Sequence, residues 1–219
     1  MEDIRSFHTF IRRQASKGES IGPIGRYQLA TIANMDQTPL QFEIFGNSTY
    51  DTTGSNTIWV KSRSSGLDKR QATVQLTIFA DGVKRIRPLI IFRGKGIRIS
   101  KEEKNQWDRR VVVRFQDNAW ADEDIMVFYF QHMWRPLTKF DENPPKLLVA
   151  DVHRPQRTDK VLRILRDECN TTLALVPPGC TSLVQPLDVA VNASFKKVRT
   201  SINHLSANLY SSTTCSSTA

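Results

Sequence analysis

The sequence predicts one α/β domain, a mixed sheet in which antiparallel strands are followed by parallel β-α-β units and which is flanked by helices. Period-two apolar runs dominate the first half of the chain, and helical spacing begins after residue 120. Short apolar runs at 146–150 and 171–176 alternate with helical patterns. With 219 residues, 39% of them apolar, one core is expected, since domains of this size bury roughly 70% of the surface that the unfolded chain exposes.

Three segments are expected along the chain. Residues 1–26 are predicted to be a helical connector, because a helical pattern is followed by a Gly/Pro/Ser-rich break. Residues 27–203 carry the alternating elements and form the domain. Residues 204–219 are rich in Ser and Thr and lack an apolar pattern, which indicates a disordered tail.

The first strand is expected over Tyr27–Asp36, closed by the extended segment before Pro39. Further β-type runs cover 56–61 and 72–80. Asp81 and Gly82 then form a tight turn that returns the chain into residues 88–92, so these strands are predicted to be an antiparallel meander, and 111–115 is expected to add a short strand.

The second half predicts alternating helices and strands. Acidic residues crowd the first turn of a helix over Ala121–Trp134. The apolar run 146–150 predicts a strand covered on both faces, ending at Asp151. Thr158 is expected to cap the next helix, which leads into the strand at 171–176.

A last helix is predicted to begin at Pro186, a residue favoured at the first helical position. Asp188 then lies in its first turn, and Asn192 lies one turn later on the same face. For Asn192, an exposed polar position is favoured over contact with a bound ligand.

The charge of the chain points to a polyanionic partner. The formal net charge is +9, and residues 84–114 hold eleven Lys or Arg against three acidic residues, a net +8. A solvated basic surface without a specific role is the equally weighted alternative. The three cysteines form no paired motif, and no apolar run could span a membrane, so a soluble protein of a reducing compartment is expected.

Three aspartates fall where an open α/β sheet binds ligands. Asp36 is expected at the end of the first strand, Asp151 after the first parallel strand, and Asp188 in the last helix. Taken singly, each has an ordinary structural role, since Asp forms turns and stabilises the first turn of a helix.

The order of elements matches the RNase H-like fold, and four blocks of residues resemble one family. The blocks are 34–40, 80–82 with 88–95, 147–151, and 176–189, which ends Gln185-Pro186-Leu187-Asp188-Val189. Together they are similar to the DDE superfamily endonuclease domain of pogo-type transposases and their domesticated relatives, including the centromere protein B and jerky groups. The resemblance covers roughly residues 27–200, and its last block is the most specific.

The resemblance implies a nuclear DNA endonuclease and strand transferase in which Asp36, Asp151 and Asp188 are catalytic and bind Mg²⁺ or Mn²⁺, with two ions. Two hard cations roughly 4 Å apart stabilise both the attacking and the leaving oxygen, and such cations prefer oxygen ligands. DNA is the expected partner, a membrane is not, and a homodimer stays open. The residues expected to contact DNA are Arg93, Lys95, Arg98, Lys196 and Lys197.

The chain departs from the family pattern in ways that bear on activity. Gln37 stands where the family usually has Glu, and residues 152–156 replace a usual Gly and His after Asp151. The chain is also expected to lack the helix-turn-helix modules of these transposases, as a truncated or domesticated piece would. Asp81 is excluded as a ligand, because its turn explains it.

Two other functions remain open. The first is a catalytically inactive transposon-derived protein that binds DNA or chromatin. The second is an RNase H-like nuclease for another nucleic acid, which the Gln185–Asp188 block disfavours. Fold alone does not separate them.

Overall fold

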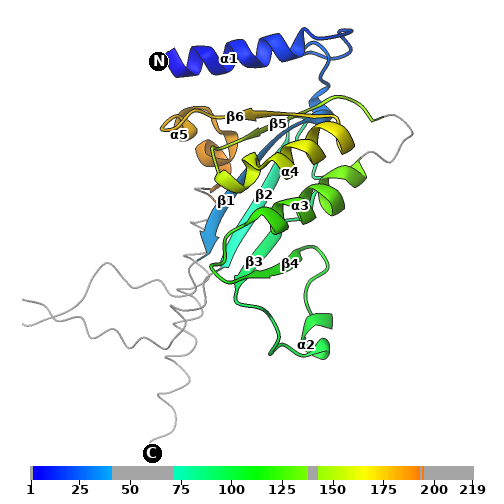
Figure 1. Cartoon of the computed structure of the whole chain (residues 1–219), viewed down its shortest axis with the longest axis vertical. Coiled ribbons are helices and arrows are strands. Elements are labelled where there is room, and N and C mark those ends of the chain that lie inside the picture. The colour runs from blue at the N-terminus through cyan, green and yellow to red at the C-terminus, as the bar shows by residue number, and fades with distance from the viewer. Residues whose placement is uncertain (1, 41–71, 138–142, 193, 195–219) are drawn as a thin grey trace, which may run out of the picture.

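The protein is described by a computed structural model that covers residues 2–40, 72–137, 143–192 and 194 (Figure 1). The predicted strand at 56–61, Lys196, Lys197 and the predicted tail lie outside these residues. The described strands are β1 (Ile32–Leu40), β2 (Ala72–Phe79), β3 (Leu89–Arg93), β4 (Val112–Gln116), β5 (Lys146–Ala150) and β6 (Thr171–Leu175).

The described helices fall mainly in the second half of the chain. They are α1 (Glu2–Ala15), α2 (Lys101–Asn105), α3 (Glu123–Tyr129, continuing through Phe130–Trp134), α4 (Asp159–Arg163, continuing through Ile164–Glu168), α5 (Thr181–Val184) and a last helical segment, Leu187–Val191. The predicted helices at 121–134 and from Pro186 are confirmed, and Thr158 caps α4 by accepting from the backbone N–H of Val161.

The six strands form one mixed sheet in the order β4-β3-β2-β1-β5-β6. β1, β2 and β3 pair antiparallel, while β1 with β5, β5 with β6, and β3 with β4 pair parallel. The predicted mixed sheet is therefore confirmed. Since β2 alone runs against the other strands, the carboxyl ends of β1, β3, β4, β5 and β6 all lie at one edge of the sheet.

The first strand differs from its prediction. β1 begins at Ile32 and runs to Leu40, so Asp36 lies in the middle of the strand, and the expectation that it ends there is wrong. β5 pairs with β1 only as far as Met35. Beyond that residue β1 has β2 as its neighbour on one side only, a position where a proline such as Pro39 is tolerated in a strand.

The sheet is buried on both faces around β5, as the apolar run predicted. Leu148 and Ala150 face the larger core, to which α3 and α4 contribute Trp134 and Leu165. Leu147 points to the opposite face and packs in a second cluster with residues of α1. In Figure 1, α3 and α4 lie together on one face of the sheet. No helix in the described part of the chain is long and apolar enough to cross a membrane.

Candidate active site

The fold brings the three predicted aspartates together from three elements. Asp36 lies in β1, and Asp151 directly follows β5. The parallel register pairs Met35 with Ala150, so Asp36 and Asp151 are the next residues on neighbouring strands. Asp188 lies in the last helical segment, which contacts β1. The site is thus at the sheet edge where the parallel strands end.

Asn34 of β1 fixes the last helical segment against the sheet. Its Nδ2 donates to the carbonyl oxygen of Val149 in β5 at 3.0 Å, and its Oδ1 accepts from the backbone N–H of Leu187 at 3.0 Å. The side chain is buried. One side chain therefore joins the three elements that carry Asp36, Asp151 and Asp188, although sequence reasoning gave it no role of its own.

Replacing Asn34 by alanine is expected to destabilise the protein by about 2 kcal/mol, because the buried N–H of Leu187 and carbonyl of Val149 both lose their side-chain partner. Urea unfolding measures the change. Asn118→Ala is the matched control, since that asparagine is exposed in a loop. Equal stability of the two variants would contradict the role given to Asn34.

Asn192 connects two of the three carboxylates. Its Nδ2 donates to Oδ2 of Asp36 at 2.5 Å and to Oδ1 of Asp188 at 3.0 Å. The residue is only 4% exposed, so the expected exposed polar position is wrong. The sequence places Asn192 one turn after Asp188, but it does not tell that this face of the helix packs against β1.

Burial and mutual repulsion shift the titration of the carboxylates. Burial, followed by the charge of Asp188, raises the pKa of Asp36 from 3.8 to about 6, against the lowering effect of the Asn192 hydrogen bond. Burial also raises the pKa of Asp151, with a further contribution from Asp188. A cation bound beside these carboxylates would relieve both their repulsion and their desolvation.

The loop after Asp151 contributes two side chains to its surroundings. Gln156, which is buried in the short helical turn Arg154–Arg157, donates a hydrogen bond that lowers the pKa of Asp151, and the charge of His153 acts in the same direction. His153 is half-buried, and its ring lies 6.4 Å from that of Trp120. The sequence showed this loop only as a departure from the family pattern, whereas the structure places it around a carboxylate.

Several buried polar atoms without a hydrogen-bond partner lie in the segments that carry Asp151 and Asp188. Among the described residues such side-chain atoms belong to His153, Gln156, Gln185 and Asn192, and elsewhere to Arg26 and to Gln37, whose side chain lies beside Gln75. Gln185 is completely buried, and neither of its amide atoms has a partner. Unsatisfied buried groups are rare in native proteins, and an ion or ordered water is a usual explanation.

These residues fit a divalent cation in chemistry, although they do not form a closed cage. No group of three or more His, Cys, Asp and Glu side chains within the described ranges stands in position to hold one metal ion. The amide of Asn192 lies between Asp36 and Asp188 instead. The carboxylates offer oxygen donors, the type that Mg²⁺ prefers, and Mg²⁺ keeps several waters, so a few carboxylates suffice.

The predicted DNA-contacting residues of the β3–α2 region lie on the surface. Arg93, at the end of β3, and Lys95 and Arg98 beyond it are exposed. Gly96 has a positive φ of 64°, and a Cβ there would lie 2.6 Å from the ring of Phe115, so the tight turn requires glycine. This turn lies at the same sheet edge as Asp151, three strands away, or roughly 14 Å.

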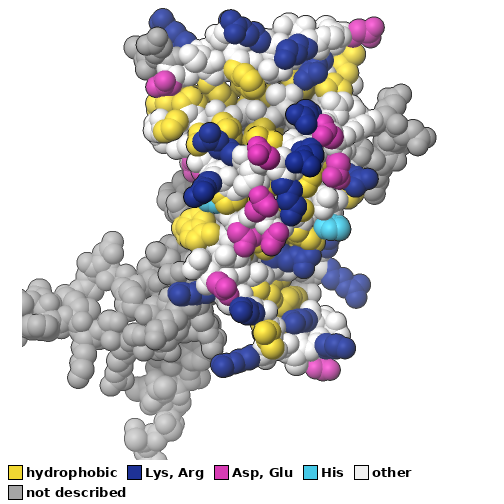
Figure 2. All heavy atoms as spheres, viewed as in Figure 1, with side chains coloured by type: hydrophobic (Ala, Val, Ile, Leu, Met, Phe, Trp, Pro, Cys, Tyr) yellow, Lys and Arg dark blue, Asp and Glu magenta, His cyan; other side chains and the backbone are white. Residues whose placement is uncertain are grey.

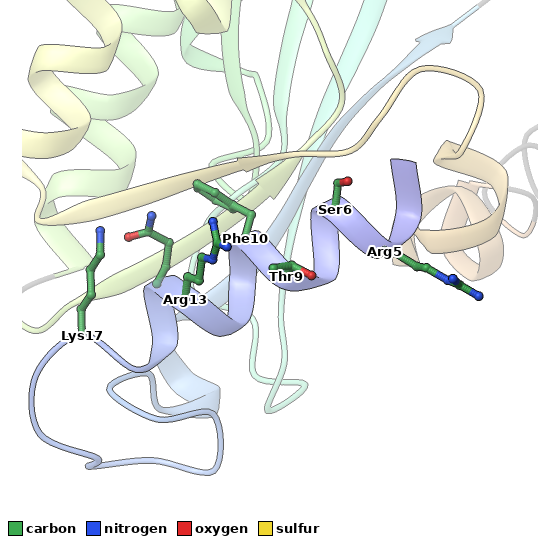
Figure 3. A pocket seen from close by; sticks show the side chains of 7 residues that line it. Arg5, Ser6, Thr9, Phe10, Arg13 and Lys17 are labelled. Atoms are coloured by element: carbon green, nitrogen blue, oxygen red, sulfur yellow. The ribbon is translucent and has the colours of Figure 1, made fainter. Parts of the chain in front are cut away.

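Other basic side chains line surface hollows. One hollow, next to the loop that follows Asp151, is lined by the exposed Arg154 and Arg157 and by Lys160, together with the acidic Glu123 and Asp159. A second lies along α1, where Arg5, Arg13 and Lys17 are among the lining residues together with Phe10 (Figure 3). Figure 2 shows basic side chains over the whole displayed face, with several acidic ones among them in its middle. Sequence reasoning missed Arg154 and Arg157, although both follow Asp151 closely.

Asp81 lies away from these residues. It belongs to the turn after β2, and β2 runs antiparallel to β1, so the turn is at the opposite edge of the sheet. Its carboxylate pairs with Arg85 at 2.5 Å, and this hydrogen bond lowers the pKa of Asp81 to about 2. The turn accounts for Asp81 fully.

Comparisons with known proteins identify the family of the chain. A family model described as DDE superfamily endonuclease matches residues 69–215. The human protein "Pogo transposable element with KRAB domain" is 30% identical over 165 residues, which are 75% of this chain and 26% of that protein. The human "Jerky protein homolog" is 26% identical over 175 residues, 76% of this chain and 29% of that protein. The chain thus spans about a quarter of the length of these relatives.

A solved structure supports the fold. The crystal structure of a pre-cleavage Mos1 transpososome matches with a TM-score of 0.50 and 9% identity, over 90% of this chain and 48% of that one. At such low identity the match concerns the fold, which is the RNase H-like fold of the transposase. Since the family model covers well over half of the 219 residues, the chain belongs to the DDE superfamily endonuclease family, whose members here include the pogo and jerky relatives.

Proposed function

We propose that this chain is the core of a DDE-type DNA endonuclease and strand transferase, in which Asp36, Asp151 and Asp188 hold two Mg²⁺ or Mn²⁺ ions. The observation that carries the proposal is the convergence of the three carboxylates, where burial, and after it the charge of Asp188, raises the pKa values of Asp36 and Asp151. Neighbouring carboxylates with raised pKa values are a common sign of a functional site.

Each aspartate has a place in the proposed reaction. Asp36 is held in β1, where it pairs with Leu76 of β2, and Asp151 is held by the hydrogen bond from Gln156. Asp188 is half-exposed and lies on the solvent side, where a phosphodiester would approach. When bound, the ions would stabilise the charge that develops on the attacking and the leaving oxygen.

The basic surface gives DNA a path to these carboxylates. Arg154 and Arg157 are exposed directly after Asp151, and Arg93, Lys95 and Arg98 lie along the same sheet edge. Contacts of this kind bind phosphates and position the duplex, but they carry little sequence information. We therefore infer nonspecific DNA binding by this domain, in the nucleus where its substrate is, with Lys196 and Lys197 as further proposed contacts.

Nicking of supercoiled plasmid tests the proposed activity. With Mg²⁺ or Mn²⁺ the protein is expected to convert the plasmid to the open circle, and with EDTA it is expected to leave the plasmid intact, because the carboxylates alone supply no counter-charge. A gel shift on the same DNA measures binding separately. Binding without nicking in either metal would rule out the enzyme.

A second candidate is a catalytically inactive DNA-binding or chromatin protein of transposon origin. The hydrogen bonds from Asn192 to Asp36 and Asp188 favour it, since they satisfy these carboxylates without a metal. This candidate predicts DNA binding that is unchanged by EDTA, together with plasmid that stays supercoiled.

A further inference from the structure

The amide of Asn192 holds a position for which the proposed function gives no reason. Its Nδ2 donates to both Asp36 and Asp188, while its Oδ1 is buried and lacks a hydrogen-bond partner among the described residues. A buried acceptor without a partner costs about 1–3 kcal/mol. An alanine at this position would avoid that cost. A functional role for the amide oxygen would explain why asparagine is present.

We propose that Asn192 is an additional oxygen ligand for a divalent cation held by Asp36 and Asp188, and that its amide turns over when the cation enters. This proposal rests on the proposed function, because it assumes that these two carboxylates bind a metal. It assigns to Asn192 a direct contact with the ion, in addition to the three aspartates.

The chemistry of the amide explains why it must turn. The NH₂ group has two hydrogens, so in the metal-free protein it can serve Asp36 and Asp188 at once. It offers no lone pair to a cation, whereas the amide oxygen has two. A cation between the two carboxylates would therefore repel Nδ2 and attract Oδ1.

The geometry allows the exchange without a change in the fold. Rotation of the planar amide by half a turn about its last side-chain torsion, which has a broad, roughly two-fold profile, swaps Nδ2 and Oδ1 in place. The backbone of Asn192 stays in the last helix, one turn after Asp188. In both orientations, the amide atom that points away from the two carboxylates has no partner among the described residues. The rotation therefore gains no protein hydrogen bond, and the cation alone drives it. Carbonyl oxygens of Asn are ordinary ligands of hard cations.

The two roles open to Asn192 predict opposite effects on metal affinity. A ligand increases affinity, so Asn192→Leu, which keeps the size and removes both polar atoms, is expected to weaken Mn²⁺ binding at least about tenfold, the effect that loss of even an outer-shell partner has. An amide that only masks the carboxylates competes with the ion. Its removal would then tighten Mn²⁺ binding and overturn the proposal, as would an unchanged affinity.

Isothermal titration of the whole chain with MnCl₂, without DNA, measures these affinities independently of nicking. Asn192→Asp is the matched variant, because it keeps an oxygen at this position and is expected to bind Mn²⁺ at least as tightly as the wild type. If Asn192→Leu fails to fold, Asn192→Ser and the side-chain amide signal of ¹⁵N-labelled wild type take its place. Titration with Mg²⁺ is expected to shift that signal, and an unmoved signal would contradict the proposal.

The outcomes also separate this proposal from the proposed function. Wild-type protein that takes up no Mn²⁺ would disprove the metal site as a whole. Wild type and Asn192→Leu that bind Mn²⁺ equally would leave the three aspartates as ligands and exclude Asn192.

Discussion

Asp188→Asn is expected to lower metal-dependent nicking by at least about 10³-fold, since each 1.4 kcal/mol of lost transition-state stabilisation costs a factor of ten and a displaced ion costs several kcal/mol. The substitution keeps the size of the side chain and an oxygen that can accept from Asn192. It removes only the negative charge, so the loss reports on metal binding and not on packing.

The same result is expected for Asp36→Asn and Asp151→Asn, and Asp81→Asn serves as the matched control. Asp81 pairs with Arg85 in an exposed turn at the opposite edge of the sheet, where loss of a surface ion pair costs little. Its variant should nick within about twofold of the wild type, a difference of under 0.5 kcal/mol. Wild-type nicking by Asp188→Asn would exclude that carboxylate from the reaction.

The second large effect is a gain in stability. Asp36→Asn should stabilise the metal-free protein at pH 8 by up to about 3 kcal/mol, because burial and the charge of Asp188 raise the pKa of Asp36 from 3.8 to about 6. This is an upper limit, since the carboxylate is partly reached by solvent. Urea unfolding in EDTA measures the difference between the two proteins.

The pH dependence of that difference has a definite sign. The folded protein binds the proton of Asp36 more tightly than the unfolded chain does, so the contribution of Asp36 to stability is complete below pH 3.8 and is lost as the pH rises through 6. The advantage of Asp36→Asn should therefore shrink by about 1.4 kcal/mol between pH 7.5 and pH 5. An advantage that is constant with pH would mean that Asp36 is not desolvated in the folded protein.

The cost that Asp36 imposes is also the reason to expect a cation there. Metal ligands must be deprotonated, so a bound ion lowers the pKa of its carboxylates and stabilises the folded protein. Residues that bind or react are often unfavourable for stability, and the expected gain in stability of Asp36→Asn would be such a case.

The sequence predicted most of the fold because the strongest signals were local. The helix at 121–134 has acidic residues in its first turn and helical spacing throughout, and β5 is a short apolar run ending in an acid. The end of β1 was predicted wrongly, since it depends on a neighbour. Pro39 stays within the strand only because β5 stops pairing with β1 after Met35.

The site was predicted only in part, because some of its residues depend on contacts between distant parts of the chain. The three aspartates lie in sequence blocks that can be recognised singly, while Asn34 and Asn192 act through contacts between residues more than 150 positions apart. Spacing shows that Asn192 shares a helix face with Asp188, but burial of that face depends on β1. A turn such as Asp81-Gly82 can be predicted from its own residues. A hydrogen bond between a strand and a helix that is distant in the sequence cannot.

The docking of the last helix onto Asn34 also sets when the site can exist during protein synthesis. A nascent chain that has emerged only as far as Gln185 contains Asp36 and Asp151 but neither Asp188 nor the backbone N–H of Leu187 that binds Asn34. At a usual rate of roughly 5–20 residues per second, synthesis of the 152 residues between Asp36 and Asp188 takes about 8–30 s. The three carboxylates can therefore come together only after Leu187 and Asp188 have left the ribosome.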